Sequence, residues 1–528
     1  MKQGTTSSKT TTTRPARAGR GPAALAGLLS ALLTAAGSPA AAQAPASPPA
    51  AALAGPARPV TGPFTLQRAV DYALEHNLTV RQNVLNSRNN QQILRQSKAA
   101  LLPSANLNGT QTWNFGTNVN PFTFEFQSQT IRSNNFSAQS QVVLFQGFQL
   151  RNTIKRNESD YEASLRDADK ARNDLSLNVA SAYLQLLLSE ELIRANQTRV
   201  ASSQAQVNRA QILLKAGSVA ESNLLDSQSQ LASDELNVIT ATNQRDIARL
   251  NLVQLLNLDP ASAAAFQIDV PQLADPDNEA PLALDLDQAY QTASGNLPEI
   301  KAADLRVQSA RRSIDLARGG YYPRLSLGGT ISTGFSSSAS TRQLTGDLIP
   351  GSALPVFQVD PLNPNTPPIP TTFAVLTPPQ PRYEFLPTGF FNQLNNNIGK
   401  TIQFALTVPI LNGLQVRTNV QRSLINEELS RVRAEQARLT LRQSIEQAFV
   451  DARAAQLQYS AAKRQVAALT LSQRNAEIRF NNGLLNGTDF NIAKNNLSAA
   501  ESNRIQAKYS FVFRRKVLDF YQGKPLAL

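Results

Sequence analysis

The chain has 528 residues, with 51 Lys and Arg against 38 Asp and Glu, so its formal net charge is +13. It contains no Cys, one His and one Met, which excludes a disulfide framework, a thiolate metal site, a cysteine nucleophile and any metal site built on two histidines. Charged residues are only 17% and apolar residues 41%, so the chain is neither a charged disordered segment nor a helical membrane bundle. Because no His stands beside a Gly-framed nucleophile, we expect a protein that is not an enzyme.

The first 42 residues have the three-part layout of a secretory signal peptide. Residues 1–22 carry five basic side chains and no acid, an apolar stretch follows over 23–37, and three alanines at 40–42 offer a cleavage site. The apolar stretch is too short to span a bilayer comfortably, which argues against a membrane anchor. We therefore expect cleavage near Ala42 and export, with a flexible Pro- and Ala-rich segment over 43–61.

The remaining chain repeats itself once. Pro103 and Gly217 recur as Pro323 and Gly483, among further matches with similar spacing, which indicates a duplicated structural unit rather than a solenoid. The second copy carries a Pro-rich insertion over 341–388 that cannot be a regular helix or a central strand, so we expect a long surface loop. The predicted organisation is a signal peptide (1–42), a flexible segment (43–61), a first repeat (62–258), a linker or equatorial segment (259–283) and a second repeat (284–528).

Each repeat contains two segments in which apolar and polar residues alternate. In 105–115, Leu107, Trp113 and Phe115 alternate with Asn and Thr, and the same period recurs near 136–145, 324–336 and 397–410. About ten alternating residues make a strand with one wet face and one apolar face, long enough to cross an outer membrane at a tilt, although a soluble sandwich alternates likewise. Four strands are too few to close a barrel, and lipid does not tolerate open edges, so other copies would have to complete one.

Each repeat ends in a predicted helical hairpin, over 148–256 and 414–520. A heptad seam of mainly apolar residues runs from Leu175 to Leu214 in the first hairpin and from Leu441 to Phe480 in the second, which predicts coiled-coil packing. The long helices stop at Gly217 and Gly483, since glycine closes helices at the C-cap, and return helices follow from about Asn223 and Asp489. Leu484 and Leu485, at the second turn, are expected to be exposed and to mark a docking surface.

These elements together predict a hollow tube. A signal peptide exports the chain, no later run of 18 apolar residues offers a transmembrane helix, and strands with one apolar face suit an outer membrane. The long helices of the predicted hairpins over 148–256 and 414–520 would then project into the periplasm. Cyclic symmetry is the common way to close such an assembly, and three copies would supply twelve strands and twelve helical passes.

The order of elements, the duplication and two local sequences resemble the TolC family of outer-membrane efflux proteins. The local sequences are VPILNG at 408–413 and RFNNGL at 479–484, and the resemblance covers essentially residues 62–522. It implies a mixed α/β membrane protein: a homotrimer whose 12-stranded outer-membrane β-barrel, with four strands per chain, continues into a periplasmic α-helical coiled-coil barrel. It also implies contacts with outer-membrane lipid, a periplasmic adaptor (membrane fusion) protein and an inner-membrane pump, and no cofactor or bound metal.

The resemblance also assigns candidate site residues. In well-known members, aspartates six and nine residues beyond the second tip glycine line the periplasmic entrance. Here those positions hold Asp489 and Ile492, and the first repeat has Asn223 and Asp226, so Asp489 and Asp226 are the candidate gate carboxylates. Asp489 could alternatively be the N-cap of the return helix, and the two roles can coexist. The residues implied in adaptor docking flank both tip glycines: Ala216, Gly217, Ser218, Asn482, Gly483 and Leu484.

Three functions follow as hypotheses. The leading one is an exit duct of a tripartite efflux pump that passively exports small molecules from the periplasm or cytoplasm to the exterior. The second is the outer-membrane duct of a type I protein secretion system, and the third is a periplasmic coiled-coil scaffold whose strands form a small sheet. Nucleic-acid binding is not expected, because the positive charge is spread along an exported chain.

Overall fold

The computed structural model describes residues 62–119, 125–270, 285–358 and 367–524. The expected signal peptide and the segment up to residue 61 lie outside the described residues. The described chain divides into two compact units. A β unit comprises residues 103–142 and 326–405, and a helical unit comprises the remainder, so the chain passes from the helical unit into the β unit and back twice.

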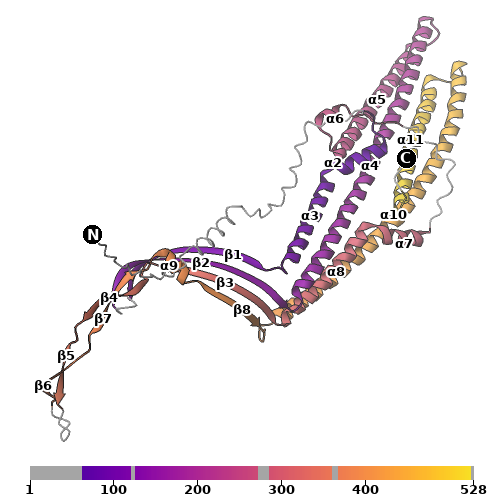
Figure 1. Ribbon diagram of the computed structural model, residues 1–528. Helices are drawn as coiled ribbons and strands as arrows, with labels where there is room; N and C mark the ends of the chain where they lie inside the picture. Colours follow the sequence, from indigo (N-terminus) through magenta and orange to yellow (C-terminus); the bar gives the residue numbers. More distant parts are fainter. Residues whose placement is uncertain (1–61, 120–124, 271–284, 359–366, 525–528) are drawn as a thin grey trace, which may run out of the picture. The chain divides into compact units, whose positions relative to one another are not determined.

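Long antiparallel hairpins dominate the helical unit (Figure 1). α4 and α10 have 67 residues each, which corresponds to about 100 Å of helix. Each is followed by a shorter return helix that packs against it, α5 on α4 and α11 on α10. The helices of this unit are α2 (Leu66–His76), α3 (Leu78–Ala99), α4 (Gln149–Lys215), α5 (Glu221–Leu256), α6 (Pro260–Ala264), α7 (Leu286–Asn296), α8 (Pro298–Arg318), α10 (Gln415–Asn481) and α11 (Gly487–Tyr521), with a short 3₁₀ turn η2 (Gly319–Tyr321) after α8.

The heptad seams lie where coiled-coil packing requires them. Every seam position from Leu175 to Leu214 in α4 is buried or half-buried, and the same holds from Leu441 to Phe480 in α10. In α10 the seam is fully buried only as far as Tyr459 and half-buried from there to the tip. The pattern of mainly apolar residues every three or four positions therefore selects the packed face of each long helix.

The main hydrophobic core surrounds Tyr183 in the middle of α4. Its ring is fully buried among the side chains of α2, α4 and α5, with Leu252 and Leu256 also at 0% exposure. The Tyr183 hydroxyl donates to the carbonyl oxygens of Phe64 (2.9 Å) and Asp269 (2.7 Å), which belong to two extended segments joined by a parallel bridge. Burial raises the pKa of Tyr183 above its ordinary range, so the phenol remains a hydrogen-bond donor.

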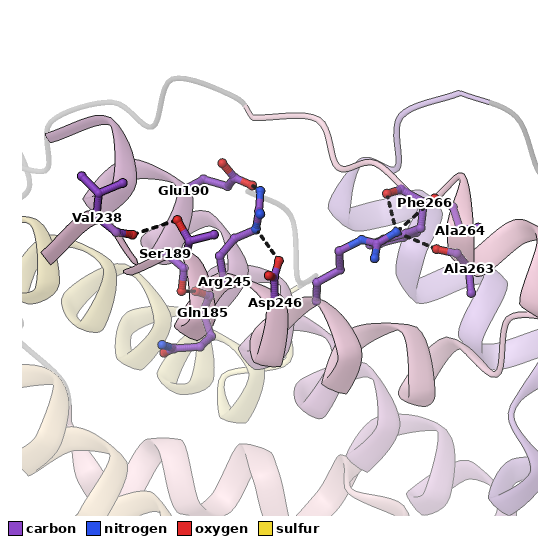
Figure 2. Close-up of polar contacts among 11 residues, drawn as sticks. Gln185, Ser189, Glu190, Val238, Arg245, Asp246, Ala263, Ala264 and Phe266 are labelled. Carbon is purple, nitrogen blue, oxygen red and sulfur yellow. Dashed lines mark hydrogen bonds and ion pairs between the residues drawn. The ribbon is translucent and has the colours of Figure 1, made fainter. Parts of the chain in front are cut away.

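Two arginines of α5 form polar contacts beside this core, one with α4 and one with the end of α6 (Figure 2). Arg245 lies between Asp246, whose carboxylate it contacts at 2.9 Å, and Glu190 of α4 at 3.6 Å. Arg249 donates from Nη2 to the carbonyl of Ala263 at 2.6 Å, and more weakly to those of Ala264 and Phe266, at the C-terminal end of α6. A cation at this end complements the carbonyl oxygens that point out of the helix.

The β unit contains one four-stranded sheet with the order β1-β2-β3-β8. Its strands are β1 (Ser104–Val119), β2 (Phe126–Gln146), β3 (Arg324–Ser336) and β8 (Gly399–Thr407). β1 and β2 pair antiparallel without a register shift and, at 16 and 21 residues, exceed the expected ten. The apolar side chains of β1 stay exposed in the single chain, including Trp113 at 53% and Phe115 at 79%. Among the strands that the structure describes, β1 and β8 each have a sheet neighbour on one side only.

The expectation of a long surface loop over 341–388 was wrong in its secondary structure, although the described residues there are mostly exposed. This insertion forms two antiparallel two-stranded ribbons, β4 (Ser340–Ile349) with β7 (Gln380–Pro387) and β5 (Ala353–Gln358) with β6 (Ile369–Leu376), before the short helix α9 (Phe390–Asn396). In a two-stranded ribbon every strand is an edge, so a proline whose nitrogen points away from the partner loses no ladder bond. Its prolines exclude a central strand but not an edge strand, which is why composition alone indicated a loop.

Candidate functional site

The tip of the first hairpin is a helix end closed by glycine. Gly217 has a φ of +73° and donates its N–H to the Leu214 carbonyl at 2.9 Å, while the Ser218 N–H reaches the Leu213 carbonyl at 2.9 Å. This pair of bonds is the Schellman motif, in which the residue after the C-cap takes the left-handed conformation. A Cβ added at Gly217 would meet nothing within 4 Å, so the positive φ, and not crowding, requires the glycine.

The second tip has the same geometry. Gly483 also has a φ of +73°, its N–H donates to the Phe480 carbonyl at 3.1 Å, and the Leu484 N–H donates to the Arg479 carbonyl at 2.8 Å. The C-cap role expected of both tip glycines is thus confirmed. The other predicted docking residues, Ala216, Ser218 and Asn482, are exposed, and Leu484 is 70% exposed.

Leu485 departs from its prediction. It is half-buried, and it lines a cavity of about 410 Å³ between the tips of the two hairpins. Phe480 and Phe490 stack beside this cavity with ring centroids 4.9 Å apart and an interplanar angle of 13°. Arg209 of α4 bridges the hairpins by donating from Nη1 to the Asn481 side-chain oxygen at 2.6 Å. Leu485 therefore packs toward the apolar interior of this tip region, whereas Leu484 remains exposed to solvent.

The structure separates the two candidate gate carboxylates. Asp226 is exposed in the first turns of α5 and lines the cavity between the tips. Asp489 is exposed in the first turn of α11 and lies outside the lining of that cavity. Both side chains thus lie near the tips, on different return helices, and are accessible to ions.

The alternative role of Asp489 as an N-cap is wrong. α11 begins at Gly487, and its N-cap is Asn486, whose side-chain oxygen accepts the Asp489 N–H at 2.7 Å. Asp489 is therefore the third residue of the helix, where a carboxylate is favoured by the positive end of the helix dipole. Asn is as good an N-cap as Asp, so residue type alone did not distinguish the two positions.

Further from the tips, a polar network links the two hairpins. The sequence analysis did not predict this network. Lys494 of α11 donates to the Ser203 hydroxyl of α4 at 2.6 Å, and that hydroxyl donates to the Asp234 carboxylate of α5. Lys494 and Asp234 lie 4.0 Å apart, with side chains 10% and 7% exposed. Burial lowers the pKa of Lys494, and the positive charge of Arg199 lowers it further, while Asp234 opposes both effects. The available signal was Ser203, which is one of three polar residues on a mainly apolar seam, with Ser189 and Asn196.

A second contact pairs the hairpins through amides. Gln230 of α5 and Asn495 of α11 exchange two hydrogen bonds, each 3.0 Å long. Within the described ranges, no group of three or more His, Asp and Glu side chains is arranged to hold a metal ion. No helix in this part of the chain combines the length and apolar character needed to cross a membrane.

Curated relatives match part of the chain. Pyoverdine export outer membrane protein OpmQ of Pseudomonas putida is 27% identical over 233 residues, which is 42% of this chain and 46% of the relative. Fusaric acid resistance protein FusA of Burkholderia cepacia is 26% identical over 215 residues, 39% of each chain. The chain aligns with less than half the length of these relatives.

Solved structures share the fold over most of the chain. CusC superposes with a TM-score of 0.67 at 17% identity, covering 89% of this chain and 98% of CusC. VceC of Vibrio cholerae gives 0.66 at 14% identity, covering 88% and 97%. The MtrE outer membrane channel of Neisseria gonorrhoeae gives 0.64 at 19% identity, covering 87% and 89%. The "Outer membrane efflux protein" family matches residues 69–258 and 389–523, so the chain belongs to the outer membrane efflux protein family, in agreement with its resemblance to TolC proteins.

Proposed function

We propose that this chain is the outer-membrane exit duct of a tripartite efflux pump, through which small molecules pass without chemistry. One observation carries the proposal: a four-stranded sheet with two open edges shares a chain with two hairpins built on 67-residue helices. Open edges and exposed Trp113 and Phe115 are unfavourable in a monomer in water and suit lipid once neighbouring copies supply the missing strands. The hypothesis of a periplasmic coiled-coil scaffold does not account for such a sheet.

Three copies provide the simplest closed assembly. Four membrane strands from each chain, β1, β2, β3 and β8, make a 12-stranded barrel, and the two hairpins of each chain make a helical barrel of twelve passes. The matching lengths of α4 and α10, and of α5 and α11, support a duplicated unit in which both halves contribute equivalently. The cleaved N-terminal signal delivers the chain, and the barrel places it in the outer membrane.

The transported class is small molecules. The relatives OpmQ and FusA are named for pyoverdine export and fusaric acid resistance, both concerned with small molecules, which favours efflux over protein secretion. The tip residues around Gly217 and Gly483 dock the periplasmic adaptor, and an inner-membrane pump supplies the energy. Their exposure, including Leu484 at 70%, supports a surface that a partner covers.

The entrance is controlled by charge. Threefold symmetry turns Asp489 and Asp226 into two rings of three carboxylates at the periplasmic end. In a narrow, wet pore such rings attract cations, oppose anions and bind a divalent ion that blocks flow. Their exposure on the return helices near the tips supports this role, because neither carboxylate is held by an ion pair within the described chain.

Planar-bilayer conductance of the detergent-purified trimer tests this function. The wild type should form discrete cation-preferring channels blocked by divalent ions, and Asp489→Ala should reduce both properties, with Asp226→Ala acting alike. Asp287→Ala is the matched control, since Asp287 is also an exposed first-turn acid, on α7. A protein that needs no detergent and forms no trimer would favour the scaffold hypothesis. Channels whose selectivity and divalent block are unchanged in Asp489→Ala and Asp226→Ala would refute the carboxylate gate.

Adaptor docking can be tested separately. The chain has no Cys, so Ser218→Cys and Asn482→Cys introduce single attachment points for a photo-cross-linker. Both should capture the periplasmic adaptor in cells, whereas a cysteine at exposed Gln436, in the first third of α10 and far from the tip, should not. Equal capture from all three positions would argue against specific docking at the tips.

A further inference from the structure

A basic groove lies between the two hairpins, apart from the tips. It has a volume of about 350 Å³ and is formed by residues of α4, α10 and α11. Three cationic side chains line it: Arg199 from α4, and Lys494 and Arg504 from α11. The one carboxylate in its lining is Glu501.

Arg199 reaches across the groove to α11. Its Nη2 donates to the Ser502 hydroxyl at 3.0 Å and to the Ser498 carbonyl, and its Nη1 donates to the Asn196 side-chain oxygen at 2.9 Å. The Glu501 carboxylate lies 3.8 Å from Nη2. The buried Nε of Arg199 finds no acceptor among the described residues. Arg199 is thus only partly satisfied, although its side chain is just 12% exposed.

Arg504 is less satisfied than Arg199. Its Nε is also buried without an acceptor in the described chain, and its guanidinium forms no ion pair there. Lys494 is compensated by Asp234, so the two carboxylates Asp234 and Glu501 face three cations. An unpaired buried donor is costly because it has given up water without gaining an acceptor. The groove therefore carries an excess of positive charge and of unused donors.

The electrostatics of the lining agree with this inventory. Burial lowers the pKa of Arg199, and Glu501 and Asp234 oppose that effect. Burial also lowers the pKa of Lys494, and the positive charge of Arg199 lowers it further. A group of like charges in a partly dehydrated groove is stabilised by an anion that supplies the missing acceptors. Guanidinium groups match tetrahedral oxyanions particularly well, because their N–H groups form a planar fork.

We propose that this groove binds a small oxyanion, such as inorganic phosphate or sulfate, between Arg199 and Arg504. The Ser202 side chain also lines the groove and offers a hydroxyl donor. Since Arg199 belongs to α4 and Arg504 to α11, the bound anion joins the two hairpins of one chain. The site thereby couples anion concentration to the separation of the hairpins, and it stands independently of the proposed transport function.

Isothermal titration of the full, detergent-purified protein with phosphate, and then with sulfate, tests the site at constant ionic strength maintained by chloride. We expect saturable binding with one site per chain. Arg504→Gln should weaken binding about tenfold to a hundredfold, as expected for the loss of charge-assisted hydrogen bonds. Arg474→Gln removes the same charge from an exposed position on α10 beside the groove residue Gln473 and should leave the affinity unchanged.

The outcomes are distinct. Absence of saturable binding to the wild type, or equal affinity in Arg504→Gln, would overturn the proposal. Equal losses in Arg504→Gln and Arg474→Gln would overturn it too, since they would indicate a general charge effect. If Arg504→Gln fails to fold by circular dichroism and size exclusion, Arg504→Lys replaces it. That variant keeps the charge without the fork, so it should bind several-fold more weakly, and wild-type affinity would refute fork recognition.

Discussion

Substituting Asp234 by Asn removes the counter-charge of a buried lysine without changing the size of the side chain. Asp234 accepts the Ser203 hydroxyl and lies 4.0 Å from the Lys494 ammonium. Two unit charges at that distance attract each other by about 4 kcal/mol at an effective dielectric constant near 20. The Asn oxygen can still accept from Ser203, so we expect Asp234→Asn to destabilise the helical unit by about 3 kcal/mol, at the lower end for a broken buried pair.

The change in stability is measured by guanidinium unfolding of the purified protein, followed by far-ultraviolet circular dichroism. Asp246→Asn is the control, because Asp246 lies on the same helix but is 60% exposed and pairs with Arg245 at the surface, where ion pairs contribute little. Replacing both members of the buried pair, Asp234→Leu with Lys494→Met, should recover most of the loss, since neither charge is then left unpaired.

The variant also has a pH signature. Burial already lowers the pKa of Lys494 from 10.5, and loss of the Asp234 charge lowers it further. The folded variant therefore releases this proton more readily than the unfolded chain, so its stability rises as the pH increases from the lowered pKa toward 10.5. The deficit relative to the wild type should shrink over that window. Wild-type stability in Asp234→Asn, or a deficit independent of pH, would refute the reasoning.

Three further predictions concern other parts of the molecule. Gly483→Ala forces an L residue into a φ of +73° and should cost about 1 kcal/mol, seen as a lower unfolding midpoint, whereas Gly295→Ala, in α7, should not destabilise. Tyr183→Phe removes the hydroxyl proton that the Asp269 and Phe64 carbonyls share, although the Phe64 carbonyl keeps the Asp269 N–H. It should cost about 1–2 kcal/mol in the same assay, and no change would show that water replaces the hydroxyl. Replacing residues 340–388 by a short Gly/Ser linker should preserve folding and channel formation, because these ribbons form sheets separate from β1-β2-β3-β8; a loss of trimers on gel filtration would assign them to assembly.

Local patterns in the sequence predicted the features that depend on residues close in the chain, namely helix faces, helix ends and strands. The heptad spacing identified the packed faces of α4 and α10, because apolar burial repeats with the helix period. The tip glycines were correctly placed as helix ends, since only glycine takes a positive φ without strain. Alternation located strands in the β unit but underestimated β2, whose first half, SQTIRSNN, is too polar to show a periodic pattern.

Only the tertiary structure decided which distant groups meet. Lys494 and Ser203 are 291 residues apart, and no local pattern pairs them. The same holds for Arg199 and Arg504, whose groove exists because two hairpins pack side by side. The ribbons of 340–387 likewise depend on cross-strand partners, which a proline count does not predict. Helix faces and turns follow from nearest-neighbour sterics and burial, whereas sites between hairpins follow from packing geometry, which the whole chain determines together.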